Sequence, residues 1–484
     1  MWFPRPWVRR LAESTKNPRT LTAVVLAAGK GKRLKSPAPK VLHPICGRPA
    51  LWHVLQVVRA ARPRAITIVV GHGADEVRAA VASWRIRPGP TFVEQHELLG
   101  TGHAVLQAER AIGDATDVLV VGGDFDPVTG ADVRRLVATH RRTRSAASIF
   151  VTELDDPAGY ARVVHEGGRL ERIVEGTDAP PALQASHEVS PLVMVFRRDD
   201  LFRALPTIGR ENRQGEYYLN EVLPILLDKG ERVSVLPVDT GGTFGVNSRA
   251  GLAAVERVVR ERVNAAHLAN GVTIVDPATA YIDVAVRIGP DTVIRPLTFL
   301  EGETRIGSGC AIGPSTRIVD SRVGDGSEVT FAVVLSSTVG RGAVVGPFAR
   351  LRGGAVLDDD TEIGNFAEVK ASRVGRGSKA KHLTYLGDAT LGRDVNVGAG
   401  TVTVNYDGYR KHRTVIGDEA SIGSDTMLIA PVKVGRQANT GAGSVISEDV
   451  PAGALAVERG ERRTVTGYRK RKDAEHRVKG ARKG

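Results

Sequence analysis

The first half of the chain alternates short apolar runs with amphipathic stretches. The runs, each of a length typical of a buried strand, fall at 22–28, 65–70, 117–123 and 145–151. Between the first two, residues 50–61 (ALWHVLQVVRAA) place their apolar side chains at the spacing of one helix face. This rhythm predicts a Rossmann-like α/β domain with a mostly parallel sheet over residues 21–247. Ligands of such sheets bind beyond the carboxyl ends of the strands.

One long helix is predicted next. Residues 248–270 are amphipathic throughout, Ser248 is a suitable N-terminal cap, and Gly271 suits the position after a helix end. We therefore expect residues 248–271 to form a linker helix between two domains.

Beyond that helix the apolar pattern changes to a period of six. Aliphatic residues recur, with slips of a residue or two, at Ile288, Ile294, Leu300, Ile306, Ile312, Ile318, Val323, Val329, Val339, Val345, Leu351, Ile363, Leu391, Val397, Ile416, Ile422, Leu428 and Val434. A sustained hexapeptide period is typical of a parallel β-helix in which each coil has three flat sides. This predicts a β-helix over residues 272–459, with residues 405–415 (NYDGYRKHRTV) leaving the period as a loop.

The net charge of +13 belongs mainly to the two ends of the chain. Residues 1–20 hold five Lys/Arg and one acidic residue, and residues 461–484 hold ten Lys/Arg and three acidic residues. This pattern predicts a disordered basic extension at 1–20 and a basic flexible tail at 460–484, both solvated. It disfavours nucleic acid as a partner.

Two cysteines, Cys46 and Cys310, cannot make a disulfide framework, so a reducing compartment is expected. No apolar run approaches the length of a membrane span, and residues 1–20 lack the apolar segment of a signal peptide. The composition therefore predicts a cytoplasmic protein without a membrane span.

A glycine-rich turn follows the first predicted strand. Residues 26–34 (LAAGKGKRL) offer backbone amides that can cradle phosphates, and Lys32 and Arg33 can neutralise them. A purely structural turn needs the same glycines, so the turn alone is weak evidence. The segment PKVLH (39–43) follows at the spacing found in sugar-phosphate nucleotidyltransferases, which the pair of motifs resembles.

The second half carries five segments in order: GPFARLR (346–352), NFAEVK (365–370), SKAKHLTYLGD (378–388), NVGAGT (396–401) and NYDG (405–408). They are similar to those of glucosamine-1-phosphate acetyltransferases. The whole chain thus resembles the family of bifunctional N-acetylglucosamine-1-phosphate uridylyltransferases / glucosamine-1-phosphate N-acetyltransferases, which make UDP-N-acetylglucosamine. The resemblance also implies that the β-helix is left-handed and that the enzyme is a homotrimer.

The resemblance implies a uridylyl-transfer site in the first half, with UTP and Mg²⁺. Its nucleotide- and sugar-binding residues would be Leu26, Ala27, Ala28, Gly29, Arg33, Lys40, Gln95, Gly100, Thr101 and Glu175. Asp124 and Asn247 would hold Mg²⁺, an ion that accepts two protein oxygens together with phosphates and waters.

The resemblance likewise implies an acetyl-transfer site in the second half, with His382 as the general base. A histidine, whose ordinary pKa is about 6.5, suits removal of a proton near neutral pH. Glucosamine-1-phosphate would be bound by Arg352, Lys370, Tyr385, Asn396 and Lys411. Acetyl-CoA would be bound by Ala399, Asn405, Tyr406, Ser424, Ala442 and Arg459. Glu368 is expected to orient either the amine or the histidine.

Three segments of the first half depart from the family pattern. They are GDFDP (123–127), which introduces Asp126, GYAR (159–162), which places Ala161 where the family has glycine, and Ser190, Pro191 and Leu192 in the sugar pocket. These changes leave two alternatives open: an acetyltransferase whose first domain is impaired or uses another sugar or nucleotide, and a non-catalytic assembly or regulatory protein. The complete set of residues around His382 argues against the second alternative.

Overall fold

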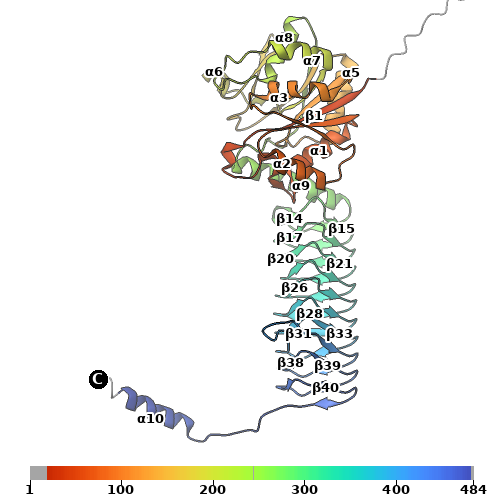
Figure 1. Ribbon diagram of the computed structural model, residues 1–484, viewed down its shortest axis with the longest axis vertical. Helices are drawn as coiled ribbons and strands as arrows, with labels where there is room; N and C mark the ends of the chain where they lie inside the picture. Colours follow the sequence, from red (N-terminus) through yellow and green to blue (C-terminus); the bar gives the residue numbers. More distant parts are fainter. Residues whose placement is uncertain (1–18, 244, 481–484) are drawn as a thin grey trace, which may run out of the picture. The chain divides into compact units, whose positions relative to one another are not determined.

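The computed structural model describes residues 19–243 and 245–480 (Figure 1). Contacts divide the chain into two units, and the division falls between Val263 and Asn264, inside helix α9 (Arg249–Ala269). The predicted limits of the linker, residues 248 and 271, lie on either side of that helix. Of the extension predicted at 1–20, all but Arg19 and Thr20 lies outside the described residues.

Four parallel strands form one half of the first unit's sheet. Their order is β5 (Thr91–Glu94), β4 (Ala65–Val70), β1 (Leu21–Ala27) and β6 (Asp117–Gly122). Each of the predicted runs in this region is a strand, and all four strands end at the same edge of the sheet. The loops that follow β1, β5 and β6 therefore meet at that edge.

The rest of the sheet is less parallel than the sequence predicts. It continues through β11 (Val193–Arg197), β7 (Ala147–Glu153), β10 (Glu188–Val189), β8 (Arg162–Glu166) and β9 (Arg169–Val174), with β12 (Val233–Pro237) on β7. β11 runs antiparallel to both β6 and β7. β8 and β9 are antiparallel because Gly167 and Gly168, both with positive φ, allow a tight hairpin between them.

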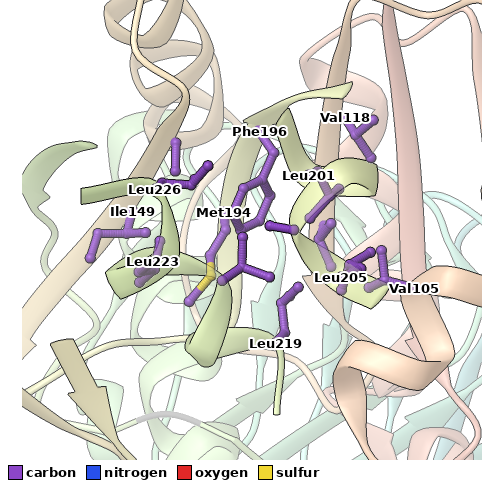
Figure 2. Packing of buried hydrophobic residues seen from close by; sticks show 14 of the residues in the cluster. Val105, Val118, Ile149, Met194, Phe196, Leu201, Leu205, Leu219, Leu223 and Leu226 are labelled. Carbon is purple, nitrogen blue, oxygen red and sulfur yellow. The ribbon is translucent and has the colours of Figure 1, made fainter. Parts of the chain in front are cut away.

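Helices cover the sheet and close its core. They are α1 (Ala50–Ala60), α2 (Ala74–Ser83), α3 (Thr101–Gln107), α4 (Glu109–Ile112), α5 (Gly130–Thr143), α6 (Pro181–Gln184), α7 (Arg198–Ala204) and α8 (Val222–Asp228). Figure 2 shows Met194 and Phe196 of β11 packed among leucines of α7 and α8. Both side chains are at most 1% exposed, so this cluster anchors the antiparallel part of the sheet by burial of apolar surface.

The second unit is a β-helix of three parallel sheets that runs from β13 (Thr273–Ile274) to β42 (Leu455–Ala456) (Figure 1). Successive coils stack in register: Ile294 pairs with Ile312 and Leu300 with Ile318, each eighteen residues on. Ile306 pairs with Val323, seventeen residues on, which is the slip seen in the sequence. The hexapeptide prediction and the left-handed β-helix class that it belongs to are confirmed.

Two segments leave the coils. Residues 405–413, between β35 (Val402–Val404) and β36 (Thr414–Ile416), form the predicted loop. Past the last coil, the predicted tail at 460–484 contains a helix that the sequence analysis does not foresee, α10 (Tyr468–Gly480). Its residues are mostly good helix formers, and Arg469 and Asp473 form an i,i+4 ion pair of 3.1 Å. Side chains 461–474 are all exposed.

Among the helices of the described ranges, none has both the length and the apolar character needed to cross a membrane.

The stacking of coils predicts which side chains carry the stability of the β-helix. Leu351→Ala removes a fully buried side chain of β26 (Arg350–Arg352) and should cost about 2–5 kcal/mol, whereas Arg350→Ala, on the outer face, should cost well under 1 kcal/mol. Circular dichroism during urea unfolding would measure both. Tryptophan fluorescence is an internal control, because all four tryptophans (Trp2, Trp7, Trp52, Trp84) belong to the first unit. Equal losses for the two variants would contradict the prediction.

Candidate active sites

The glycine-rich turn brings two predicted motifs together. Gly31 has a φ of +60°, and a Cβ placed on it would lie 2.7 Å from the Cβ of Lys40. Glycine is therefore required for the turn to pack against the short helix that begins at Lys40 (Lys40–Leu42). The result is that the amides of the turn and the Lys40 side chain belong to one site.

Lys40 connects the two predicted metal ligands. Its Nζ donates to Oδ2 of Asp124 at 2.5 Å and to Oδ1 of Asn247 at 2.6 Å. Asp124 follows β6, and Asn247 precedes α9. Burial alone would raise the pKa of Asp124, but the Lys40 ammonium outweighs that effect and holds the pKa below its ordinary value. Two oxygen atoms therefore converge on a cationic group.

Two adjoining cavities surround these residues. The first, of about 230 Å³, is lined by Leu26, Ala28, Gly29, Lys40, Gln95, Gly100, Thr101 and Asp124 among others. The second, of about 250 Å³, is lined by Arg33, Thr101, Asp124, Glu175 and Asn247 among others. Ala27 lines neither cavity and is 2% exposed, so its part in nucleotide binding stays a prediction. The other residues predicted for this domain all reach the site.

Several cavity residues were not foreseen. Nδ2 of Asn220 donates to Oε1 of Glu175 at 2.8 Å, and Tyr160 and Asn220 both line the second cavity. Burial raises the pKa of Glu175 to about 7. The only sequence signal near Asn220 is the segment QGEYYL (214–219), which directly precedes it.

The departures from the family pattern gather in the second cavity. Asp126, Ala161, Ser190 and Leu192 line it, whereas Pro191 does not. Oδ2 of Asp126 accepts a hydrogen bond from the Leu192 amide at 3.1 Å, and Oγ of Ser190 donates to the carbonyl of Phe150 at 2.8 Å. Burial and the neighbouring Asp124 raise the pKa of Asp126 to about 8. The Asp126 carboxylate, the Leu192 amide and the Ser190 hydroxyl, all at positions that depart from the family pattern, are thus engaged in hydrogen bonds within the protein.

Three of the residues implied for the sugar phosphate lie on one sheet of the second unit. Arg352 lies on β26, Lys370 on β29 (Glu368–Lys370) and Tyr385 on β32 (Tyr385–Gly387), in successive coils. Nε of Arg352 donates to Glu368 at 2.5 Å. Nζ of Lys370 contacts both carboxylate oxygens of Asp388, at 3.0 and 2.8 Å. The side chains implied for a sugar phosphate therefore share one face, and Asp388 joins them unforeseen.

Four of the residues implied for acetyl-CoA, together with His382, form a column along one corner of the coils. His382 ends β31 (Lys379–His382), and the register of that strand with β34 (Asn396–Val397) places Ala399 one coil further. The amide of Asp425 donates to the carbonyl of Ala399, and that of Gly443 to Ser424, both at 2.7 Å. Nε of Arg459 donates to the carbonyl of Ala442 at 2.8 Å. The shared order along this corner is His382, Ala399, Ser424, Ala442 and Arg459.

The loop at 405–413 is folded back on itself. Tyr406 and Lys411 form an antiparallel bridge, and Asp407 accepts hydrogen bonds from the amides of Arg410 and Tyr409 and from His412. These bonds lower the pKa of Asp407 to about 2. The loop also brings Lys411 close to Lys370. The hydrogen bond with Lys370 and the positive charge of Lys370 lower the pKa of Lys411. Asn396 instead lies on the sheet that holds His382.

Known proteins match both halves. The family of MobA-like NTP transferase domains matches residues 23–221. The bifunctional protein GlmU of Thermoanaerobacter pseudethanolicus is 42% identical over 449 residues, which cover 93% of this chain and 97% of that protein. GlmU of Heliobacterium modesticaldum is 45% identical over 441 residues, covering 90% and 95%, and that of Thermotoga maritima is 44% identical over 456 residues, covering 94% and 100%.

The chain belongs to the GlmU family. Because the matches span nearly all of the chain, the resemblance seen in the motifs is confirmed for both halves, and the chain is an enzyme of the bifunctional GlmU type. The comparisons do not assign individual residues, whose roles rest on the geometry above.

The buried Glu175 predicts a pH dependence of stability. Its pKa of about 7 lies above the ordinary 4.5 of the unfolded chain, so the folded state holds an extra proton between these values and loses stability as pH rises through them. Glu175→Gln removes this loss. Relative to the parent, the variant should gain on the order of 2 kcal/mol in free energy of unfolding between pH 5 and pH 8. Urea unfolding followed by tryptophan fluorescence would measure this gain. The prediction would be refuted if the free energies of unfolding of the parent and the variant changed equally between pH 5 and pH 8.

Proposed function

We propose that the chain makes UDP-N-acetylglucosamine in two steps. The β-helix transfers an acetyl group from acetyl-CoA to glucosamine-1-phosphate, and the first unit then transfers uridylate from UTP to N-acetylglucosamine-1-phosphate with release of pyrophosphate. The observation that carries the proposal is the column of His382 and the implied acetyl-CoA residues, set in a chain that matches GlmU proteins from end to end.

In the acetyl step, the amine of glucosamine-1-phosphate attacks the thioester carbonyl, the carbon–sulfur bond breaks, and coenzyme A leaves as the thiol. His382 accepts the proton that the amine loses. Arg352, Lys370 and Lys411 supply positive charge for the sugar phosphate. The Asn405 amide donates a hydrogen bond to the oxyanion that forms on the carbonyl oxygen in this proposed step.

In the uridylyl step, the sugar phosphate attacks the α-phosphate of UTP in line with the leaving pyrophosphate. Arg33 and Lys40 hold the triphosphate, so the protein acts mainly by positioning. The oxygens of Asp124 and Asn247 fit Mg²⁺, because they already converge on the ammonium of Lys40. Mg²⁺ would neutralise phosphate charge at this site.

The Gln95 amide supports a nucleobase contact in the first cavity. Its Nε2 donates to the carbonyl of Gly100 at 3.1 Å and lies 3.0 Å from Nδ1 of His103. In the His103 tautomer whose Nδ1 accepts, both N–H groups of Gln95 are used within the protein, which leaves the carbonyl oxygen for an N–H of the base.

A homotrimer built through the β-helix is part of the proposal. Exposed apolar side chains follow one another at successive corners: Phe331, Phe348, Phe366 and Leu383, which are 40%, 53%, 61% and 64% exposed. The rings of Phe348 and Phe366 stack with centroids 5.0 Å apart. Such a column is unusual on a monomer and suits contact with another copy. Leu383 directly follows His382, so the contact would border the acetyl-transfer site.

The proposed enzyme acts on small molecules in the cytoplasm. Cys46 and Cys310 are both buried thiols, as suits a reducing compartment.

Separate assays of the two reactions test the proposal. With glucosamine-1-phosphate and acetyl-CoA, the parent should release thiol; with N-acetylglucosamine-1-phosphate, UTP and Mg²⁺, it should release pyrophosphate. His382→Ala should lower only the first rate, and Asp124→Ala only the second, each by about 100-fold or more.

The outcomes separate the alternatives. Thiol release without pyrophosphate would mean that the cavity of Asp126, Ser190 and Leu192 has lost or changed its substrate, and other sugar phosphates and nucleotides would then be screened. Silence in both assays from a folded oligomer would favour the regulatory alternative.

The trimer proposal has its own test. Phe348→Asp puts a charge into the apolar column one coil away from Phe366 and should convert the trimer to monomers in light scattering. Acetyl transfer should fall at least about 10-fold, because the site loses its neighbouring copy, while pyrophosphate release stays near the parent rate. Phe348→Tyr keeps the ring and should change neither. A parent that is monomeric at assay concentration would contradict the proposal.

A further inference from the structure

One carboxylate holds two residues of the proposed acetyl-transfer site. Oδ2 of Asp388 accepts hydrogen bonds from Nζ of Lys370 at 2.8 Å and from Nδ2 of Asn405 at 2.5 Å, and Oδ1 accepts a second contact from Lys370 at 3.0 Å. The Asp388 and Lys370 side chains are 20% and 13% exposed. Burial alone would raise the pKa of Asp388, but the bonds from Lys370 and Asn405 outweigh it and lower the pKa.

The corner itself does not need a carboxylate. The same corner in earlier coils is formed by Asp320, Ser336, Gly353 and Ala371, all with positive φ like Asp388. The amides of Ala371 and Asp388 donate to the equivalent carbonyl one coil back, at 3.1 and 3.0 Å. Ala371 makes the same turn one coil before Asp388. The turn therefore does not require the carboxylate of Asp388, which can serve another role.

The charges around Asp388 indicate what its side chain does. Lys370 and Lys411 are close enough to lower the pKa of Lys411, so their ammonium groups repel each other. A carboxylate beside Lys370 offsets the repulsion and fixes a long side chain that would otherwise sample many rotamers. The bond from Asn405 uses one N–H of its amide and leaves the second N–H free for a ligand.

We propose that Asp388 is a positioning residue that fixes Lys370 and Asn405 relative to each other. The inference rests on the proposed acetyl transfer, in which Lys370 binds the sugar phosphate and Asn405 contacts the acetyl group. Through Asp388, the position of Lys370, which binds the sugar phosphate, determines the position of Asn405, which contacts the acetyl group.

The test variant is Asp388→Asn. Asparagine fits the positive φ but has no charge and one acceptor oxygen fewer, so it cannot neutralise Lys370 or accept from both Lys370 and Asn405 while keeping the second contact of Lys370 with Oδ1. The kcat for acetyl transfer should fall about 10- to 100-fold and the KM for glucosamine-1-phosphate should rise, as expected for reacting groups displaced by a fraction of an ångström. Pyrophosphate release, which depends on the first unit, should stay at the parent rate.

Two controls separate positioning from folding. Asp320→Asn, at the same corner four coils before Asp388, should change neither reaction. Asp388→Ala should keep the parent's thermal midpoint, as Ala371 makes the same turn, yet lose acetyl transfer at least as much as Asp388→Asn. A loss of activity that follows a loss of thermal stability in both Asp388 variants would overturn the inference.

A double-mutant cycle provides the sharper readout. If Asp388 acts through Asn405, the Asp388→Asn/Asn405→Ala double variant should be nearly as active as Asn405→Ala alone with respect to kcat. Additive losses, or an Asp388→Asn variant with parent kinetics, would overturn the inference. A parent without any acetyl transfer would instead refute the proposed function, so the two failures are distinguishable.

Discussion

The second unit depends on one constraint: each coil must close in about eighteen residues, so that its inward aliphatic side chains land on those of the coil before. Because neighbouring strands lie about 4.8 Å apart, residues one coil apart become close neighbours on the surface as well. Residues spread from 382 to 459 thereby form one column. In the same way Asp388 meets Lys370, eighteen residues before it, and Asn405, seventeen residues after it. The loop at 405–413 is tolerated because it leaves at a corner and lets the register resume at β36.

The first unit assembles its site differently, from loops at the carboxyl edge of the parallel strands. Side chains of helix α9 hold two of these loops by hydrogen bonds. Nε of Arg249 donates to the carbonyl of Leu34 in the glycine-rich turn at 3.1 Å, and Nη1 of Arg262 donates to the carbonyl of Pro127, just beyond Asp124, at 2.6 Å. Since Asn247 directly precedes the same helix, one rigid element sets the turn, the aspartate loop and the asparagine together.

The sequence predicts features that repeat or that are local. The hexapeptide period fixed the β-helix, and Ser248 caps α9 as expected, accepting from the amide of Gly251 at 3.1 Å. Features that depend on tertiary choices were not predictable in the same way. The antiparallel strands β8 to β11 result from pairings across the sheet. Asp388 stood in a recognised motif, but the period gives only its coil and not the direction of a side chain at a corner.

Both sites use the same device on unrelated scaffolds. Each holds a lysine against an aspartate before any phosphate arrives, Lys40 on Asp124 and Lys370 on Asp388. A free lysine would give up about 2 kcal/mol of rotamer entropy when it binds a phosphate, and clustered cations would repel one another in the empty site. The carboxylate lessens both costs in advance. It also competes with the incoming phosphate, so the aspartate needs a second partner to keep it in place once the lysine turns to the substrate. Asn405 is such a partner for Asp388. In the proposed reaction, this arrangement links the arrival of the sugar phosphate to the position of the amide that contacts the acetyl group.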